Sequence, residues 1–257
     1  PENIQYWMAF QMLLGNDDTQ SRNMYLYSPQ NSTKWYIIPW DNDSILMKNE
    51  RRLVSKDSDQ ANSWEVGVSN YWGNQLFQRL LKSKEFRKGL DEKMDELRKT
   101  ITGDKISSMS NEYAAVIKPY LAKMPDQMHA KTTPDNYDKI LADLPNELEN
   151  NYKIYKTSLE KPQPFFINKP EVANNKLKLS WGASYDFNNS KLTYTVELAK
   201  DYEFKDKVFE KSGLKTLSAE TDTLPKGQYF VRVTATNEAG QSQRAFDYYV
   251  NGDNSKQ

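Results

Sequence analysis

The chain has 257 residues, which is long enough for two domains with separate hydrophobic cores. Its 35 basic and 35 acidic residues cancel, so no overall charge would attract nucleic acid, and no apolar run approaches the roughly 20 residues of a membrane helix. The absence of cysteine excludes disulfides and cysteine-based zinc sites, and a single histidine leaves almost no material for a Ser-His-Asp triad or a His-rich metal site. A metal site would therefore need oxygen ligands, which favour Mg²⁺ or Ca²⁺.

The N-terminal part of the chain predicts a buried helix followed by a β-hairpin. Residues 3–14 are apolar on most sides of a helix, which is typical of a buried helix, and Gly15 supplies a stop signal. Residues 23–27 and 34–39 are aromatic and β-branched and are separated by turn-forming residues, so they predict a hairpin with a long loop. The polar stretch 48–70 lacks periodicity and predicts a long surface loop.

Three segments with apolar residues at helical spacing follow the predicted loop. They cover about 73–101, 105–123 and 135–159. Because proline lacks the amide hydrogen that a helix interior uses, Pro145 is expected to divide the last segment into two helices.

The helical period ends at a proline-rich segment, EKPQPFFINKP at 160–170, which predicts a linker. Beyond it, apolar residues alternate with a period of two in 176–181, 194–198 and 229–235. Short strands at such spacing predict an all-β sandwich. The predicted divisions are a first domain at 1–160, a linker at 161–170, a sandwich domain at 171–251 and a tail at 252–257.

Four carboxylates and one amide lie on either side of the predicted hairpin: Asp17, Asp18, Asn23, Asp41 and Asp43. A buried helix, a loop Asp, an Asn, a hairpin and a further Asp follow one another here, as in the C-lobe of protein kinases. In kinases the loop Asp accepts the proton of the substrate hydroxyl, while the Asn and the later Asp hold magnesium. Asp18 and Asn23 have the five-residue offset of that pattern, and Asp41 directly follows the second predicted strand.

A plainer interpretation is that these side chains are turn and cap residues, because Asp and Asn favour such positions. That interpretation suffices for each of them taken singly. Their combination with the hairpin and with Pro39-Trp40-Asp41-Asn42-Asp43 favours a site instead. The choice between Asp17 and Asp18 rests on spacing alone.

The segments GNDDTQSRNMYLY at 15–27 and WYIIPWDND at 35–43 together resemble the pattern of the CotH (spore coat protein H) kinase family. The resemblance implies a divergent protein-kinase-like fold that transfers phosphate from ATP to Ser or Thr of a protein with Mg²⁺. It also implies that Asp18 is the catalytic residue and that Asn23 and Asp41 bind the cofactor and the metal. Asp43 would be an accessory metal ligand.

Some parts of a kinase are not recognisable in the sequence. We find no Gly-rich phosphate loop and no strand Lys paired with a helix Glu, and the family has these parts upstream of the quoted motifs. The resemblance therefore implies that the chain is the C-terminal part of the kinase domain, with the N-lobe missing, and we expect the isolated chain to be inactive. The alternative is a non-catalytic scaffold or binding protein of the spore coat or cell surface with a degenerate kinase-like domain.

Residues 164–251 resemble a fibronectin type III domain. Trp181 matches the core Trp of an early strand. The run from Leu224 to Val233 matches Leu-x-x-Gly-x-Tyr-x-Val-x-Val, in which Tyr229 would make a corner hydrogen bond.

These resemblances together imply an α+β fold class. A mostly helical C-lobe of a divergent protein-kinase-like fold with a β-hairpin is expected to precede an all-β immunoglobulin-like (fibronectin type III) sandwich. The expected partner is a protein substrate of the spore coat or cell surface, with neither nucleic acid nor membrane insertion, and the ligand of the sandwich is left open. The expected location is extracellular, or at the spore or cell surface of a bacterium.

Overall fold

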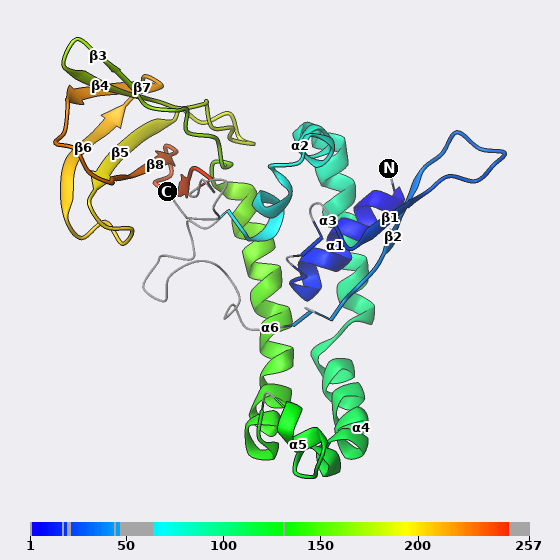
Figure 1. Ribbon diagram of the computed structural model, residues 1–257. Helices are drawn as coiled ribbons and strands as arrows, with labels where there is room; N and C mark the ends of the chain where they lie inside the picture. Colours follow the sequence, from blue (N-terminus) through cyan, green and yellow to red (C-terminus); the bar gives the residue numbers. More distant parts are fainter. Residues whose placement is uncertain are drawn as a thin grey trace. The chain divides into compact units, whose positions relative to one another are not determined.

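The computed structural model describes residues 2–16, 18–19, 22–43, 45–46, 64–130 and 132–246 (Figure 1). The described residues fall into two compact units, one made of 2–46 and 76–155 and the other of 64–75 and 156–246. The first is mainly helical and the second contains the β-sheets, so the predicted α+β fold class is confirmed. The predicted domain ranges stay a prediction.

The first unit is built around α1 (Glu2–Leu14), which confirms the predicted buried helix. Trp7, Met8 and Leu13 are among its buried side chains, and Trp7 stacks on Phe77 with ring centroids 5.5 Å apart. The helix ends at Gly15, whose φ of +67° is a left-handed conformation that glycine adopts without a steric penalty.

The predicted hairpin is confirmed as the antiparallel pair β1 (Met24–Tyr27) and β2 (Tyr36–Pro39). It projects away from the helices in Figure 1. Its base is fastened to α1, because the Asn3 carboxamide donates to the Ile37 carbonyl at 3.2 Å and accepts from the Ile37 amide at 2.7 Å. The buried Ile37 side chain adds an apolar contact, so the hairpin base has a defined position beside α1.

The predicted segment 73–101 forms two helices, α2 (Gln75–Lys82) and α3 (Lys84–Thr100), with a break at Ser83. The break has a local cause, because the Ser83 hydroxyl accepts a hydrogen bond from the Phe86 amide and so caps a new helix. Buried Phe86, Leu90 and Met94 form the inner face of α3.

Next come α4 (Gly103–Leu121), the short α5 (Asp126–His129) and α6 (Pro134–Glu160). The expected division at Pro145 is wrong, because α6 is continuous through this residue. A proline removes only one helical hydrogen bond, and here the ring also packs closely on another helix. A Cβ placed on Gly103 would lie 3.1 Å from the Cβ of Pro145, so the missing side chain of Gly103 leaves space for the proline.

The second unit begins, among the described residues, with a 3₁₀ helix, η3 (Gly67–Tyr71), where a surface loop was predicted. Val66 and Val68 are buried, so this part of the loop prediction, which covered residues 48–70, is wrong. The apolar residues of this short buried turn follow neither a strand nor a helix period, so their pattern in the sequence does not reveal that they are buried. Residues 48–63 of the predicted loop lie outside the described residues.

Two antiparallel sheets form the remainder of the second unit, and their facing sides share a hydrophobic core. The three-stranded sheet has the order β3-β4-β7 and the four-stranded sheet the order β6-β5-β8-β9. Their bounds are β3 (Glu171–Ala173), β4 (Lys176–Ser180), β5 (Thr193–Ala199), β6 (Lys207–Leu214), β7 (Ser218–Asp222), β8 (Phe230–Thr236) and β9 (Ser242–Arg244). The strands predicted at 176–181, 194–198 and 229–235 correspond to β4, β5 and β8.

The proline-rich segment before the sandwich starts with residues that are buried in the second unit. Gln163 is fully buried, and its carboxamide donates to the carbonyls of Ser158 at 2.9 Å and Lys161 at 3.1 Å. It also accepts from the Ser69 hydroxyl at 3.2 Å. Each polar atom of this side chain therefore has a hydrogen-bond partner, which fastens Gln163 to the end of α6 and to η3.

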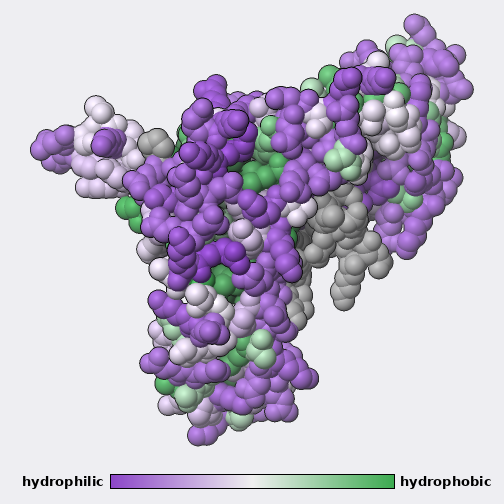
Figure 2. Space-filling view, turned by 180° about the vertical axis from the view of Figure 1, so that it is seen from behind, coloured by the Kyte–Doolittle hydropathy of each residue, from purple (hydrophilic) through white to green (hydrophobic). Residues whose placement is uncertain are grey.

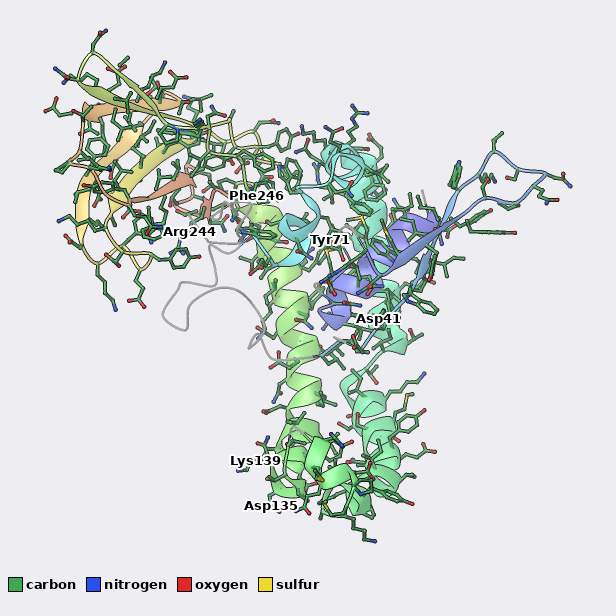
Figure 3. The ribbon with its side chains drawn as sticks, viewed as in Figure 1. Asp41, Tyr71, Asp135, Lys139, Arg244 and Phe246 are labelled. Carbon is green, nitrogen blue, oxygen red and sulfur yellow. The ribbon has the colours of Figure 1, made fainter. Side chains whose placement is uncertain are left out.

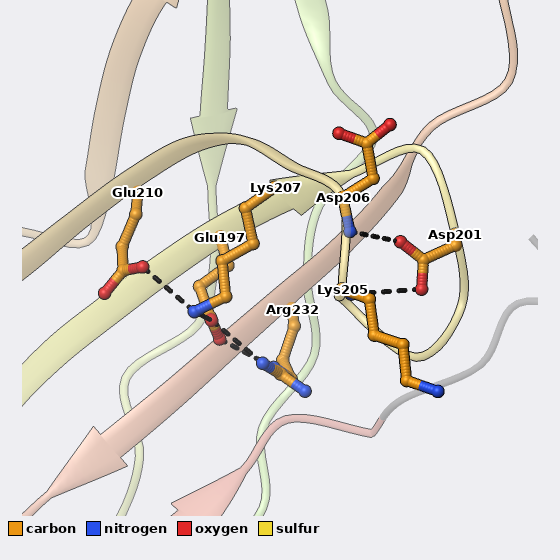
Figure 4. Close-up of polar contacts among 7 residues, drawn as sticks. All are labelled: Glu197, Asp201, Lys205, Asp206, Lys207, Glu210 and Arg232. Carbon is orange, nitrogen blue, oxygen red and sulfur yellow. Dashed lines mark hydrogen bonds and ion pairs between the residues drawn. The ribbon is translucent and has the colours of Figure 1, made fainter.

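An ion-pair cluster crosses the four-stranded sheet (Figure 4). Glu197 accepts two hydrogen bonds from the Arg232 guanidinium at 2.6 and 2.8 Å, and Lys207 lies 2.6 Å from the same carboxylate. The Glu197 side chain is only 8% exposed. Burial raises the pKa of Glu197, but the hydrogen bonds from Arg232 and Lys207 outweigh burial, and the net pKa is lowered.

Candidate functional site

The predicted site residues lie where α1 ends and at the base of the hairpin. Asn23 precedes β1 and Asp41 follows β2 by two residues, and the Trp40 amide donates to the Asn23 carbonyl at 3.2 Å. Both Asn23 and Asp41 have a left-handed backbone, with φ of +56° and +54°. Asn and Asp tolerate this conformation better than most residues, and such backbone strain clusters at functional sites.

Asp18 and Asn23 are in direct contact. The Asn23 carboxamide donates to Asp18 Oδ2 at 3.1 Å, and Arg22 Nε donates to Asp18 Oδ1 at 2.5 Å. The Asp18 side chain is 37% exposed and that of Arg22 is 72% exposed. Water screens an ion pair this exposed, so the pairing is weak and Arg22 can leave Asp18 at little cost.

Asp41 is joined to the same region through its backbone. Its carbonyl accepts from the Asn16 carboxamide at 3.4 Å, while its side chain is exposed. Figure 3 shows Asp41 beside the C-terminal end of α1. Asp43 is also exposed, two residues further along. Asp17, the alternative to Asp18, lies outside the described residues.

The structure therefore brings together only part of the predicted set by direct contacts. In the part of the chain that the structure describes, no three acidic, histidine or cysteine side chains gather closely enough to hold a metal ion. The Asn23 amide oxygen is a further oxygen donor. It accepts no hydrogen bond from any described residue, and with the exposed Asp41 carboxylate it fits the oxygen ligands that Mg²⁺ prefers.

An amide network that the sequence did not reveal supports the site. Asn16 is 2% exposed, and its carboxamide donates to Asn42 Oδ1 at 3.2 Å as well as to the Asp41 carbonyl. Its own oxygen accepts from the Asp18 amide at 3.3 Å. Fully buried Gln11 donates to Asn42 Oδ1 at 3.3 Å. Asn16 thus connects the Asp18 loop to the segment carrying Asp41.

One signal could have pointed to this network. Gln11 is a polar residue in a helix that is otherwise mostly apolar, and polar side chains in such positions need a hydrogen-bond partner. Its Oε1 atom is buried without a partner among the described residues. The partner residues Asn16 and Asn42 are far apart in the sequence, so the sequence alone could not match them.

A cavity of about 610 Å³ lies elsewhere in the helical unit. It is formed where α4 ends and α6 begins, and Leu121, Gln127 and Pro134 are among its lining residues. None of the predicted site residues lines it, so it adds nothing to the site at the hairpin base.

A helical unit with an Asp loop, an Asn and a hairpin that leads to a second Asp is an arrangement consistent with a kinase-like fold. The family model for the CotH kinase protein matches residues 2–155, which is more than half of the chain. The chain therefore belongs to the CotH kinase family. A search of curated proteins finds no match.

Membership of this family indicates a kinase-like protein and suggests, in general terms, the use of ATP and a metal, a protein substrate and a surface location. None of the helices in the described part of the chain combines the length and apolar character that crossing a bilayer requires. The family match ends at residue 155 and does not cover the sandwich, so the fibronectin type III assignment stays a prediction.

Proposed function

We propose that this protein is a secreted bacterial protein kinase of CotH type that transfers phosphate from ATP to Ser or Thr of a spore-coat or cell-surface protein. The observation that carries the proposal is the contact between Asp18 and Asn23 at the base of the hairpin, 3.1 Å long, within the region matched by the family. The five-residue offset of this pair is that of the catalytic Asp and metal-binding Asn of kinases.

Asp18 is the proposed proton acceptor for the substrate hydroxyl. Its carboxylate is partly exposed and therefore open to a protein substrate, and Asn23 holds one of its oxygens in place. Arg22 occupies the other oxygen, and the exposure of this arginine allows it to move aside when a hydroxyl approaches. A general base must reach the proton it removes, and a fixed carboxylate meets that requirement.

Asn23 and Asp41 are the proposed ligands of Mg²⁺–ATP, with Asp43 as an accessory ligand. When bound, the metal would neutralise charge on the phosphates during transfer. The hydrogen bond between the Trp40 amide and the Asn23 carbonyl keeps the two ends of the hairpin together. Asn16 binds the backbone carbonyl of Asp41 and so keeps this residue near the Asp18 loop.

Phosphate transfer by the native protein tests this proposal. Asp18→Asn should lower the transfer rate by at least about 100-fold, because a general base contributes that much or more. Asp41→Asn should raise the Mg²⁺ concentration needed for ATP binding, measured by calorimetry. The control is Asp135→Asn in the first turn of α6, an exposed residue outside the site. Unchanged rates in both site variants would refute the assignment.

A non-catalytic scaffold is the second candidate. Two observations favour it: Asp18 is paired with Arg22, and the described carboxylates do not form a three-membered metal cluster. In that case the sandwich would space or present the kinase-like unit at a surface. Absence of both Mg²⁺–ATP binding and phosphate transfer in the native protein would support the scaffold.

We also propose that the sandwich is a fibronectin type III-like module. Its support is the Tyr229 hydroxyl, which donates to the Pro225 carbonyl at 3.1 Å as a tyrosine corner does, and the burial of Trp181 in the core. Such a module predicts no particular ligand.

A further inference from the structure

Helix α4 carries an apolar surface that no described part of its own unit covers. All of its residues are described, and Ala114 is the only buried one among them. Large apolar side chains along α4 are 43–66% exposed: Met109, Tyr113, Val116, Ile117 and Tyr120. Met124, just beyond the helix, is 64% exposed. We call these six side chains the α4 stripe.

The stripe occupies one side of the helix. With 3.6 residues per turn, its helical members span about 100° of the circumference, which is the width of a face that normally packs on a partner. The opposite side of α4 faces α6, because Lys118 on that side forms an ion pair with Asp138 of α6. Seen from behind, the lower helical part in Figure 2 shows green side chains among purple ones.

The area of the stripe is large enough for a stable contact. Large apolar side chains have roughly 200 Å² each, so the exposed fractions correspond to about 650 Å² of surface. This exceeds the largest apolar patch of most monomers, about 300–600 Å², and approaches the ~800 Å² that each partner contributes to a standard interface. The stripe contains no charged side chain that would have to be desolvated.

The order of residues in the stripe points to the partner. Met109, Tyr113 and Val116 are separated by four and three positions, and Ile117, Tyr120 and Met124 repeat the same residue classes in reverse, separated by three and four. Within α4, which ends at Leu121, a two-fold axis between positions 116 and 117 would place Tyr113 opposite Tyr120 and Val116 opposite Ile117 of the other copy. A two-fold interface requires such self-complementarity, because residue i contacts residue j and j contacts i.

We propose that the protein forms a homodimer in which the α4 stripes of two copies pack against each other in antiparallel orientation. The occupant of the stripe is a second copy of this chain. The proposal rests on α4 alone and is independent of the catalytic assignment at the hairpin base.

The first experiment measures the mass of the full chain by sedimentation over a range of concentrations. We expect a dimer that dissociates on dilution. Val116→Glu should weaken it by at least about 100-fold, because the two-fold axis brings the two new carboxylates together. Val116→Lys should weaken it in the same way, and a mixture of the two variants should form a heterodimer. Circular dichroism should show the helix content unchanged, since Val116 is 66% exposed.

A second experiment locates the contact. The sequence has no cysteine, so a single introduced cysteine can only react with its counterpart in another copy. Ile117→Cys should form a disulfide-linked dimer under mild oxidation, whereas Asp135→Cys on the exposed start of α6 should not. A wild-type chain that stays monomeric at high micromolar concentration, or equal cross-linking of both cysteine variants, would overturn the proposal and leave the stripe to a different protein.

Discussion

Replacing Gly15 by alanine is expected to destabilise the helical unit, because this glycine combines two constraints at the end of α1. Its φ is +67°, a region that a residue with a Cβ adopts only with strain. A Cβ at this position would also lie 2.6 Å from the Nδ2 atom of Asn151. That atom donates to the Leu13 carbonyl at 3.3 Å and so satisfies one of the last carbonyls of α1.

The magnitude follows from these contacts. The left-handed conformation costs an alanine about 1 kcal/mol. Displacing buried Asn151 leaves the Leu13 carbonyl without its partner, which costs about 1–3 kcal/mol. Alanine restricts the unfolded chain and returns roughly 0.5–1 kcal/mol. The net loss in the free energy of unfolding is therefore about 2 kcal/mol.

Urea unfolding followed by the circular dichroism of the helices measures this loss. Gly213→Ala in β6 is the matched control, followed on the unfolding transition of the sandwich that contains it, because Gly213 has a φ of +68° and no described atom within 4 Å of an added Cβ. Gly213→Ala should lower the free energy of unfolding by less than about 1 kcal/mol, since the added Cβ introduces backbone strain but no close contact. In an Asn151→Ala background the cost of Gly15→Ala should fall to that of the control. An equal cost with and without Asn151 would refute the reasoning.

Two further predictions concern Glu197 and Asn16. Burial raises the pKa of Glu197, but Arg232 and Lys207 donate to the carboxylate and lower the net pKa in the folded protein. The ionised Glu197 therefore stabilises the fold above the unfolded pKa of about 4.3, and this stabilisation is lost as pH falls through the lower folded pKa. Glu197→Gln should lower the free energy of unfolding by about 2 kcal/mol at neutral pH and by less in acid, measured by urea unfolding across pH. A loss that stays constant down to about pH 3 would contradict this assignment. Asn16→Ala should lower the stability of the helical unit by about 2 kcal/mol and reduce phosphate transfer, measured by unfolding and by the transfer assay, because Asp18 and Asp41 lose their common partner. Unchanged transfer in a folded Asn16→Ala protein would show that this link does not position the site.

The elements with a clear local signal, either a period or a characteristic composition, were predictable. Strands β4, β5 and β8 alternate apolar and polar residues, while α1 was predictable from an apolar run of helical length and the hairpin from its aromatic and β-branched residues. Strands β3 and β9 are only three residues long, and β6 is largely polar and exposed, so their patterns are too weak to recognise.

Pro145 shows the opposite case, in which a strong local signal was overridden. Proline disfavours a helix interior by several kcal/mol in isolation. In the folded unit its ring lies close to Gly103, and α6 continues through it. Local preference is a weak guide where tertiary packing compensates for it.

By itself the sequence determined the family, the order of the elements and the identity of the candidate residues, because these depend on residue types and on short spacings such as that between Asp18 and Asn23. Only the tertiary structure decided which of these residues meet. It revealed Asn16 as the link between Asp18 and Asp41, and it showed that the residues it describes leave the α4 stripe exposed. The physical reason is that hydrogen bonds between amides and the burial of a helix face depend on segments distant in the chain, and no local period records which segments those are.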